Sequence, residues 1–421
     1  MAQAKYTTHQ GMNDILPGEV EKWQALERLI HREARKFNFE EIRTPVMEQT
    51  ELVVRSVGRE TDIVSKEIYS FTRGEDNYVL RPEGTAPVVR SYIQHHLDQR
   101  GGTQKFYYIG PMFRAERPQK GRLRQFHQFG IEIMGTGNAV ADAECIAFMI
   151  HIYDVVGIKN TTLKINSIGD PASRDNYKQA LTDYFTPLKD KLSEVSRKRL
   201  EKNPLRILDS KEAEDRPLVE NAPRIADFLN PESKNHFEQV KLLLGELEIP
   251  FEEDPLLVRG LDYYTRTAFE LISPDLGAQD ALAGGGRYDL LAEEIGGPST
   301  PAIGFAAGIE RLLLACEELE IDIPGLLADQ VDIYIVSLGE EGRKWALKHL
   351  PKLRRHGVSA TMDYDGRSMK AQMKDANRKN ARFAIIVGEN ELKENRFTFR
   401  DMEASEEISL PFDSIVEKVV T

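Results

Sequence analysis

The sequence predicts an α/β protein in two parts, and three observations lead to this prediction. Aromatic-rich segments with period-two alternation indicate a mainly antiparallel sheet in an α+β domain at residues 1–325. A charged, helix-favouring stretch at about 171–245 indicates a helical insertion within that domain. Strand-like and helix-like segments alternate in residues 331–421, which is typical of a small α/β domain with a mainly parallel sheet.

The elements of the first part follow from local patterns. Residues 21–37 form the first predicted helix, because apolar side chains recur there at helical spacing. An extended segment follows, since Pro45 disfavours helix at the residue before it. Four predicted strands come next, and the last two form an antiparallel hairpin with a basic tip. Their sequences are EIYSFT, NYVLRP, QKFYYIGPMFR and RQFHQFGIEIMG.

Strand patterns return after the insertion. The segments LLVRGLDYYTRTAFELI and DALAGGGRYDLL read as strands, and residues 301–320 read as a strand, a glycine turn and a helix. Residues 322–330 form a predicted linker. The C-terminal part then begins with the strand VDIYIVSLG.

The composition favours a compact protein, because 41% of the 421 residues are hydrophobic and 29% are charged. No apolar run approaches the roughly 20 residues that a membrane span needs. The N-terminus lacks the apolar segment of a secretory signal, and acidic residues begin at Asp14. We therefore expect a cytoplasmic protein with no membrane partner. Cys145 and Cys316 lie in apolar stretches, and we interpret both as buried structural thiols.

The net charge of −12 argues against nonspecific coating of nucleic acid, which needs clustered Lys and Arg. The charge is unevenly spread, however. Residues 331–421 hold 16 basic and 15 acidic side chains, a net of +1, so residues 1–330 carry −13. A more basic C-terminal part can still bind RNA at chosen patches.

The hairpin tip concentrates cationic side chains around a proline and a glycine. Guanidinium groups match phosphate oxygens in pairs, so the tip suits a polyphosphate or a nucleic-acid backbone. A solvated tip with ordinary surface charge is the alternative. The cationic residues are Arg114, Arg117, Lys120, Arg122 and Arg124.

The returning strand of the hairpin places polar groups on one face. Period-two spacing puts Gln128, Gly130 and Glu132 on the same side. A carboxylate and an amide that face a sheet interior need polar partners, and a cationic or imidazole ligand would supply them. Glu83, in VLRPEGTAPVVR, strengthens this interpretation. Internal salt bridges with arginines elsewhere in the sheet are the alternative.

A second group of polar residues follows the insertion. In LVRGLDYYTRTAFE, a regular strand would let at most one of Tyr263 and Tyr264 face a ligand directly. An arginine on this apolar strand needs an anion, and for Arg259 this is either a ligand phosphate or Asp262. The glycines 284–286 allow a substrate to approach the main chain closely.

Arg311 lies in the first turn of a helix, after two glycines, where it can meet an anionic phosphate. Pairing with Glu310 or Glu318 on the helix surface is the alternative.

Taken together, these segments resemble the motifs of the histidyl-tRNA synthetases, within the class II aminoacyl-tRNA synthetases. The resemblance runs from GMNDILPGE to the C-terminal part, essentially the whole chain. The arginine-rich hairpin is similar to motif 2 of class II, residues 301–316 to motif 3, and the segment with Pro45 to motif 1. LVRGLDYYTRTAFE and ALAGGGRYD resemble the histidine-specific signatures. The resemblance implies activation of histidine by ATP and transfer to the 3′ end of its tRNA.

The resemblance also implies roles for single residues. Arg114 and Arg259 would be catalytic and hold the α-phosphate of ATP, Glu116 would accept from the adenine amino group, and Arg122 would meet the terminal phosphate. Phe126 and Arg311 would stack on adenine from its two sides. The histidine ligand would contact Glu83, Gly84, Thr85, Gln128, Glu132, Tyr263, Tyr264, Gly284, Gly285 and Gly286.

The partners implied by the resemblance are tRNA, Mg²⁺ carried by ATP with no protein-bound metal, and a second copy of the chain in a homodimer through motif 1. Residues 331–421 would bind the anticodon, with a basic stripe at helical spacing whose alternative is a solvated helix face. The residues implied for tRNA binding are Arg117, Gln119, Lys370, Lys374, Arg378 and Arg382.

Two other proteins could share this fold without the chemistry. One is the regulatory paralogue of ATP phosphoribosyltransferase, which lacks an anticodon-binding domain and usually breaks the histidine-specific motifs. The other is a catalytically silent tRNA sensor of the kind fused to stress kinases. Here the motifs and the C-terminal part are present, and no kinase motif such as HRD with DFG occurs.

Overall fold

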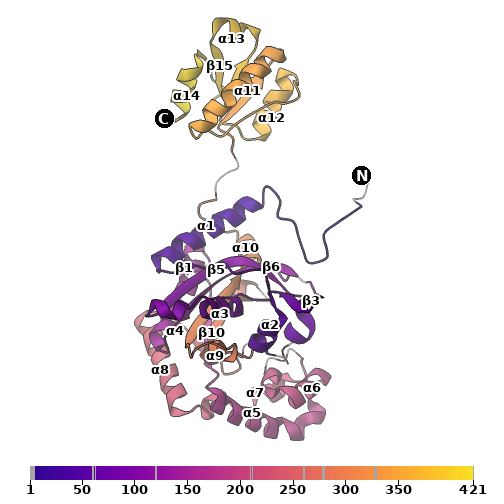
Figure 1. Ribbon diagram of the computed structural model, residues 1–421, viewed down its shortest axis with the longest axis vertical. Coiled ribbons are helices and arrows are strands. Elements are labelled where there is room, and N and C mark those ends of the chain that lie inside the picture. Colours follow the sequence, from indigo (N-terminus) through magenta and orange to yellow (C-terminus); the bar gives the residue numbers. More distant parts are fainter. Residues whose placement is uncertain are drawn as a thin grey trace. The chain divides into compact units, whose positions relative to one another are not determined.

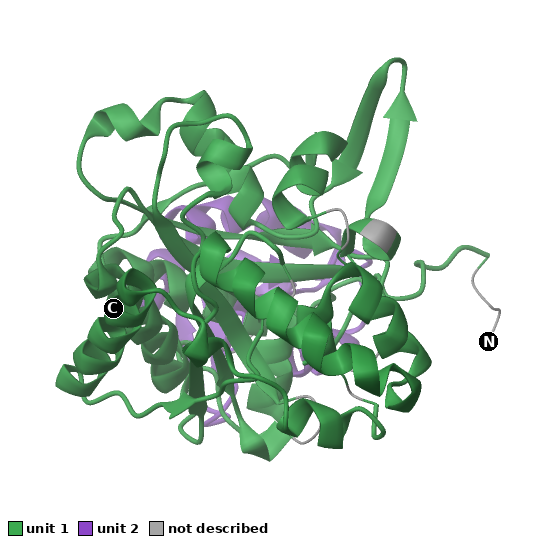
Figure 2. Cartoon of the chain, turned by 90° about the horizontal axis from the view of Figure 1, so that it is seen from below, with its two compact units in different colours: residues 1–326 green, residues 327–421 purple. Residues whose placement is uncertain are grey.

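The computed structural model describes residues 5–58, 61, 63–118, 121–208, 210, 212–258, 261–276, 280–326 and 330–420. The chain divides into two compact units, Met1–Leu326 and Leu327–Thr421 (Figure 2). No helix in these ranges has both the length and the apolar content needed to cross a lipid bilayer.

The first unit is built on an eight-stranded sheet (Figure 1). Its inner pairings are antiparallel, and only the two edge pairings, β1 with β5 and β7 with β8, are parallel. The predicted mainly antiparallel sheet is therefore confirmed. In spatial order the strands are β1 (Glu40–Glu41), β5 (Gln104–Phe113), β6 (Gln125–Met134), β11 (Ala302–Gly308), β10 (Ala281–Arg287), β9 (Thr265–Ile272), β7 (Thr162–Ser167) and β8 (Glu252–Glu253).

The two faces of this sheet carry different clusters. On β6, Phe129, Ile131 and Ile133 belong to the main apolar core, while Met134 belongs to a second cluster. The predicted alternation is thus present, and the side chains of Gln128 and Glu132 point away from the main core. The main core packs against α1 (Val20–Lys36), α4 (Ala139–Val156), α8 (Pro231–Glu246) and α10 (Ile309–Glu318). The second cluster includes α3 (Thr85–Gln94) and α9 (Leu291–Glu294).

A small subdomain precedes α3. Its three antiparallel strands, in the order β2-β4-β3, carry α2 on one side (Figure 1). The segment with Pro45 leads into it as an extended chain, as predicted. The elements are β2 (Met47–Gln49), α2 (Thr50–Val57), η1 (Ile63–Glu67), β3 (Tyr69–Arg73), β4 (Asp76–Leu80) and, after α3, η2 (Leu97–Arg100).

The helical segment after β7 has two structurally different parts. Its first helices enclose an apolar cluster of their own, with Tyr177, Leu181 and Phe185. The last helix, α8, instead gives Phe237 and Val240 to the main core. The expected insertion at about 171–245 thus combines a separate subdomain with a core helix. The subdomain contains α5 (Pro171–Phe185), η3 (Thr186–Lys191), α6 (Glu194–Lys202), η4 (Pro204–Ile207), α7 (Arg216–Glu220) and η5 (Ile225–Asp227).

The second unit has a five-stranded sheet in the order β13-β12-β14-β15-β16. The predicted parallel core is confirmed, since β12 pairs in parallel with β13 and β14. The antiparallel strands β15 and β16 were not predicted. The elements are β12 (Ile333–Ser337), α11 (Gly339–Arg355), β13 (Ala360–Met362), α12 (Met369–Arg378), β14 (Phe383–Val387), α13 (Glu389–Glu394), β15 (Phe397–Asp401), β16 (Glu407–Leu410) and α14 (Phe412–Val420).

Candidate active site

A cavity of about 460 Å³ lies where β6, β10 and β11 meet the hairpin tip. The structure brings together in its lining residues that are far apart in the sequence, from the hairpin, from the glycine run and from the start of α10. The predicted site residues among them are Arg114, Glu116, Arg122, Phe126, Gln128, Gly284 and Arg311.

Two hairpin arginines that were predicted to bind phosphate, Arg114 and Arg122, both lie near the carboxylate of Glu116. Glu116 lies 3.7 Å from the Arg114 guanidinium and 3.6 Å from that of Arg122. Arg114 also donates from Nε to the Pro82 carbonyl at 2.9 Å and lies over the Phe126 ring, 5.3 Å from its centroid. One face of Phe126 is therefore covered by a cation in this state.

Arg311 lies against the hairpin tip. Its Nε donates to the Ala281 carbonyl at 3.2 Å, and a Cβ added to Gly121 would come within 3.0 Å of its Nη1. Burial lowers the pKa of this guanidinium. Glu310 is engaged elsewhere, since its carboxylate accepts from the backbone N–H of His127 at 2.9 Å. Arg311 thus forms one wall of the cavity, beside the strand that carries the three glycines.

Glu132 is fully buried at the inner end of the same β6 face. Its carboxylate accepts hydrogen bonds from the Thr85 hydroxyl at 2.8 Å and from the Tyr288 hydroxyl. Burial, together with the nearby Glu83, raises the pKa of Glu132 to about 8, against the lowering effect of these two bonds. Its partners are hydroxyl groups, so the alternative of an arginine salt bridge does not apply to Glu132.

Glu83 holds the start of α3. Its buried carboxylate accepts from the backbone N–H groups of Thr85 at 2.6 Å and Ala86 at 2.8 Å, and burial raises its pKa. Gly84 is needed for close approach, because a Cβ there would come within 2.3 Å of the Tyr108 ring. Residues 83–85 therefore form a tightly packed wall beside Glu132.

Gln128 and Gly284 are the predicted histidine-binding residues in the cavity lining, whereas Glu83, Glu132 and the two tyrosines lie outside it. Within the described part of the chain, the Oε1 atom of Gln128 is buried without a hydrogen-bond partner. A buried acceptor of this kind has a free-energy cost unless a donor meets it. The site is therefore chemically incomplete at this atom, and an ammonium group would complete it.

The tyrosine pair differs from the prediction. Strand β9 begins at Thr265, so the regular strand expected across Tyr263 and Tyr264 is absent and the period-two argument does not apply. Both side chains are buried, with ring centroids 4.7 Å apart. A Cβ on Gly286 would come within 2.8 Å of the Tyr264 ring, so this glycine and Tyr264 are in close contact.

Two predicted residues, Arg259 and Gln119, lie outside the described residues. The proposed Arg259–Asp262 ion pair therefore stays a prediction. Arg117 is exposed on the hairpin tip. Both cysteines are buried, as expected of structural thiols.

Sequence reasoning missed two residues next to the glycine run. Tyr288 binds Glu132, as described above, and Arg287 is fully buried. Arg287 pairs with Asp142 of α4 and donates to Asp289 at 3.0 Å, so it anchors the glycine strand to the main core. The sequence signal that could have identified them is their position, since Arg287 and Tyr288 directly follow the three glycines.

The predicted basic stripe of the second unit is partly wrong. Helix α12 ends at Arg378, so Arg382 follows a turn and is not in helical register with the others. Arg378 pairs with Asp375, and Arg382 lies 3.1 Å from Asp332. Lys370 and Lys374 are exposed on α12.

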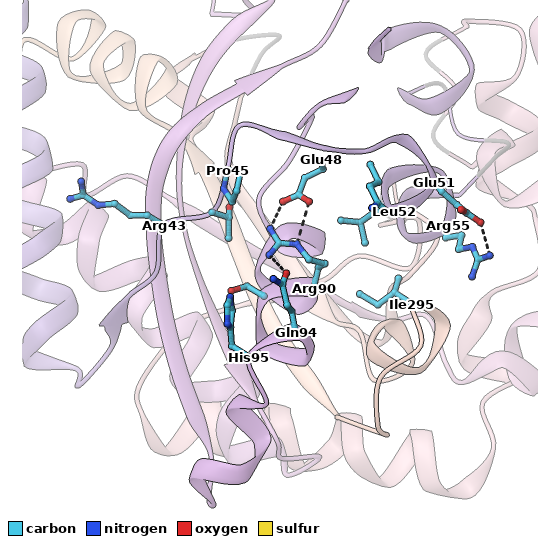
Figure 3. A pocket seen from close by; sticks show the side chains of 13 residues that line it. Arg43, Pro45, Glu48, Glu51, Leu52, Arg55, Arg90, Gln94, His95 and Ile295 are labelled. Atoms are coloured by element: carbon cyan, nitrogen blue, oxygen red, sulfur yellow. Dashed lines mark hydrogen bonds and ion pairs between the residues drawn. The ribbon is translucent and has the colours of Figure 1, made fainter. Parts of the chain in front are cut away.

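A second groove, of about 580 Å³, lies on another surface of the first unit (Figure 3). Arg90 of α3 crosses it to pair with Glu48 of β2, and it also donates to Gln94 at 3.1 Å. Arg43, Pro45 and the Glu51–Arg55 pair border the same groove.

Comparison with known proteins gives a consistent result over the whole chain. Residues 11–312 match the family model described as Histidyl-tRNA synthetase, and residues 332–421 match the model described as Anticodon binding domain. A curated histidine–tRNA ligase of Natranaerobius thermophilus is 47% identical, with 97% of each chain covered. One of Streptococcus uberis is 48% identical, with 98% of this chain and 99% of the relative covered.

Solved structures agree. The apo histidyl-tRNA synthetase of S. aureus has a TM-score of 0.83 at 41% identity and covers 99% of this chain and 100% of its own. A chain titled as an ATP phosphoribosyltransferase regulatory subunit/histidyl-tRNA synthetase from Bacillus halodurans has a TM-score of 0.64 at 22% identity. The match covers 89% of this chain and 97% of that one. That second likeness shows a shared fold only.

Proposed function

The chain belongs to the histidyl-tRNA synthetase family and is an aminoacyl-tRNA synthetase that joins histidine to tRNA, and we propose that it does so in the 460 Å³ cavity beneath the hairpin tip. The silent paralogues are not favoured, because full-length relatives at 47% and 48% identity are histidine–tRNA ligases. Pyrophosphate exchange into ATP that depends on histidine tests the activity directly. If the folded protein showed no histidine-dependent pyrophosphate exchange, the assigned activity would be contradicted.

The cavity holds the ATP half of the proposed site. This half comprises Arg114, Glu116, Arg122, Phe126 and Arg311. The observation that supports it is the placement of two guanidinium groups around Glu116 at the mouth of the cavity. Arg114 would move from Phe126 to the α-phosphate, Glu116 would accept from the adenine amino group, and Arg122 would meet the terminal phosphate. The exposed ring face of Phe126 and the Arg311 guanidinium would then enclose adenine.

The chemistry needs no protein nucleophile. The histidine carboxylate attacks the α-phosphorus of ATP, pyrophosphate leaves, and the negative charge on the equatorial oxygens is stabilised by Arg114 and, as the resemblance implies, by Arg259. The terminal ribose hydroxyl of tRNA then attacks the carbonyl of the adenylate and AMP leaves. Positioning and electrostatics therefore account for the catalysis.

We expect ATP to enter as its Mg²⁺ complex. Glu270 and Asp280 contribute carboxylates to the same cavity lining as the arginines, and oxygen ligands are those that Mg²⁺ prefers. Bound with ATP, Mg²⁺ would neutralise charge on the β- and γ-phosphates. The lining is compatible with a metal that arrives with the nucleotide.

The histidine half of the proposed site is formed by Glu132, Gln128 and the wall at 83–85, and of these residues Gln128 lines the cavity. The unpartnered Gln128 Oε1, together with Glu83 and the Thr85 hydroxyl, would receive the α-ammonium group. The Glu132 carboxylate would accept an imidazole N–H, with Tyr264 and Tyr263 alongside. The glycines 284–286 would floor the pocket, as the resemblance implies, and Gly285 and Gly286 let this strand pack closely, because a Cβ there would come within 2.2 Å of the Gly304 carbonyl and 2.6 Å of the Thr267 carbonyl.

We propose that residues 1–325 form the catalytic domain and residues 331–421 the anticodon-binding domain. Lys370 and Lys374 offer exposed charge to the RNA backbone, while Arg378 and Arg382 would have to exchange Asp partners. On the catalytic side, Arg117 and Gln119 of the hairpin would contact the acceptor end. A truncation after residue 326 should keep histidine-dependent adenylation and lose most tRNA charging. Undiminished charging by the truncated protein would refute the assignment.

We also propose a cytoplasmic homodimer. The groove of Figure 3 lies on the segment that resembles motif 1, since Arg43, Thr44 and Pro45 line it. In a two-fold dimer the same surface of each copy would be buried. Light scattering should give twice the chain mass of 47.8 kDa, and a monomer at micromolar concentration would contradict the proposal.

A further inference from the structure

Arg174 of the insertion contacts the segment that carries the two buried tyrosines of the proposed histidine site. Its Nη1 group donates two hydrogen bonds, to the backbone carbonyl of Asp262 at 3.1 Å and to that of Tyr264 at 2.9 Å. These carbonyls stand on either side of Tyr263. One guanidinium nitrogen therefore holds the main chain that carries both buried tyrosines.

The same segment is tied down at both ends. The backbone carbonyl of Arg266 accepts from the Ile168 N–H at 2.7 Å, and its backbone N–H donates to the Gly169 carbonyl at 2.8 Å, so the chain entering the insertion pairs with this residue. At the other end, the Asp262 N–H donates to the Val57 carbonyl at 3.2 Å. Because β9 begins only after Tyr264, its ladder does not fix the tyrosines, and these local contacts do.

Arg174 lies on a capped helix that packs into the insertion's own apolar cluster. It lies in the first turn of α5, whose N-terminus is capped by the Asp170 carboxylate accepting from the Ser173 N–H at 2.9 Å. One turn later, Tyr177 is buried in the insertion's own core and donates to the Pro223 carbonyl at 2.9 Å. In Figure 1, α5 lies with α6 and α7 at the end of the unit below the sheet. A displacement of the insertion would carry Arg174 with it.

We propose that Arg174 is a positioning residue for histidine recognition, and that it makes the affinity for histidine depend on the position of the helical insertion. The inference rests on the proposed function, since it takes Tyr263 and Tyr264 as the border of the bound amino acid. Arg174 does not touch the substrate. It acts by fixing the carbonyls of Asp262 and Tyr264, and thus the two rings.

Variants of Arg174 separate this role from simple stabilisation. Arg174→Met keeps an apolar stem of similar length and removes both donors, and Arg174→Lys keeps one charged donor group without the planar fork. Arg199→Met is the matched control, because Arg199 Nη1 also donates to a backbone carbonyl, that of Arg206 at 2.9 Å, but within the insertion alone. Each variant is assayed for histidine binding by calorimetry, for the KM of histidine and of ATP, and for melting temperature.

Arg174→Met should raise the Kd and KM for histidine about tenfold, the scale of two lost hydrogen bonds, while the KM for ATP stays near the wild-type value. Arg174→Lys should recover part of the loss. Arg199→Met should lower the melting temperature and leave histidine affinity unchanged.

Two results would overturn the inference. In the first, Arg174→Met melts earlier but its folded fraction binds histidine as the wild type does. In the second, histidine and ATP affinity fall together. If Arg174→Met does not fold, Arg174→Lys decides by the same two criteria. A failure of the proposed function is recognised separately, because wild-type protein would then show no histidine-dependent exchange, whereas calorimetry with histidine alone still tests Arg174.

Discussion

The two halves of the proposed site, one for histidine and one for ATP, hold their charged groups in opposite ways. On the histidine half, Glu83 and Glu132 are buried, and their carboxylates already accept bonds from fixed amide and hydroxyl donors. On the ATP half, the side chain of Arg122 is 54% exposed, and Glu116 lies between it and Arg114 at distances above 3.5 Å. The first half is preorganised, while the second has loosely paired charges that ATP can rearrange. Selectivity and catalysis should therefore respond to different substitutions.

The largest effect is expected on the ATP half. Arg114→Ala should reduce the single-turnover rate of adenylation by about 10²-fold or more, the scale seen when one donor to transition-state charge is lost. The KM values for histidine and ATP should move much less, because the charge develops only during reaction. A variant with lower melting temperature but full adenylation rate would mean that Arg114 only supports the hairpin.

Arg259→Ala should behave in the same way, since the resemblance places this guanidinium opposite Arg114 on the α-phosphate. The alternative ion pair with Asp262 predicts a different pattern, namely a lower melting temperature with near-normal pyrophosphate exchange. Measuring both quantities on one preparation of the variant separates the two.

Matched glutamate variants test the division itself. Glu132→Gln keeps the volume of the side chain but, assayed above pH 8 where Glu132 is ionised, weakens the charge-assisted bond to the imidazole, so the KM for histidine should rise about tenfold with little change for ATP. Glu116→Gln should raise the KM for ATP, with little change in the KM for histidine. If Glu132→Gln impaired ATP binding and left histidine dependence intact, the two halves would be wrongly assigned.

The smallest effect concerns the dependence of stability on pH. Burial raises the pKa of Glu132 to about 8, far above the value of about 4.3 for a glutamate in an unfolded chain. Between these values the folded protein binds a proton that the unfolded chain has lost. The free energy of unfolding therefore falls as pH rises through this window.

Glu132→Gln removes the titrating group, so its unfolding free energy should fall less steeply across the same window. Urea unfolding at several pH values measures both slopes, with Glu116→Gln as a control from the exposed half. Equal slopes for wild type and Glu132→Gln would show that burial does not hold the proton on Glu132.

Most of the frame of the site could be predicted because it rests on local patterns. Alternation alone placed Gln128 and Glu132 on one face of β6, and the glycines before Arg311 marked the start of α10 correctly. What failed depended on where regular structure stops. The hydrophobic pattern before Tyr263 resembles a strand, yet β9 begins at Thr265.

Long-range contacts could not be predicted. The bond from Tyr288 to Glu132 joins β6 to the end of β10 across β11, and only the strand register brings them together. Similarly, Arg174 looks like one of many charges on a polar helix until its distance to Tyr264 is known. Helical spacing also extended too far at Arg382, because the turn after Arg378 carries no strong breaker such as proline.

The split of the helical segment has a consequence for building chimeras. Since the helices between residues 171 and 229 have their own core, they form a natural cassette for exchange with a relative. The graft should end before α8, which fills the main core, and should retain the arginine at position 174. A graft chosen by helix content alone would include α8 and would not keep Arg174. The resulting hybrid would lose the native helix of the main core and the hydrogen bonds from Arg174 to the segment that carries Tyr263 and Tyr264.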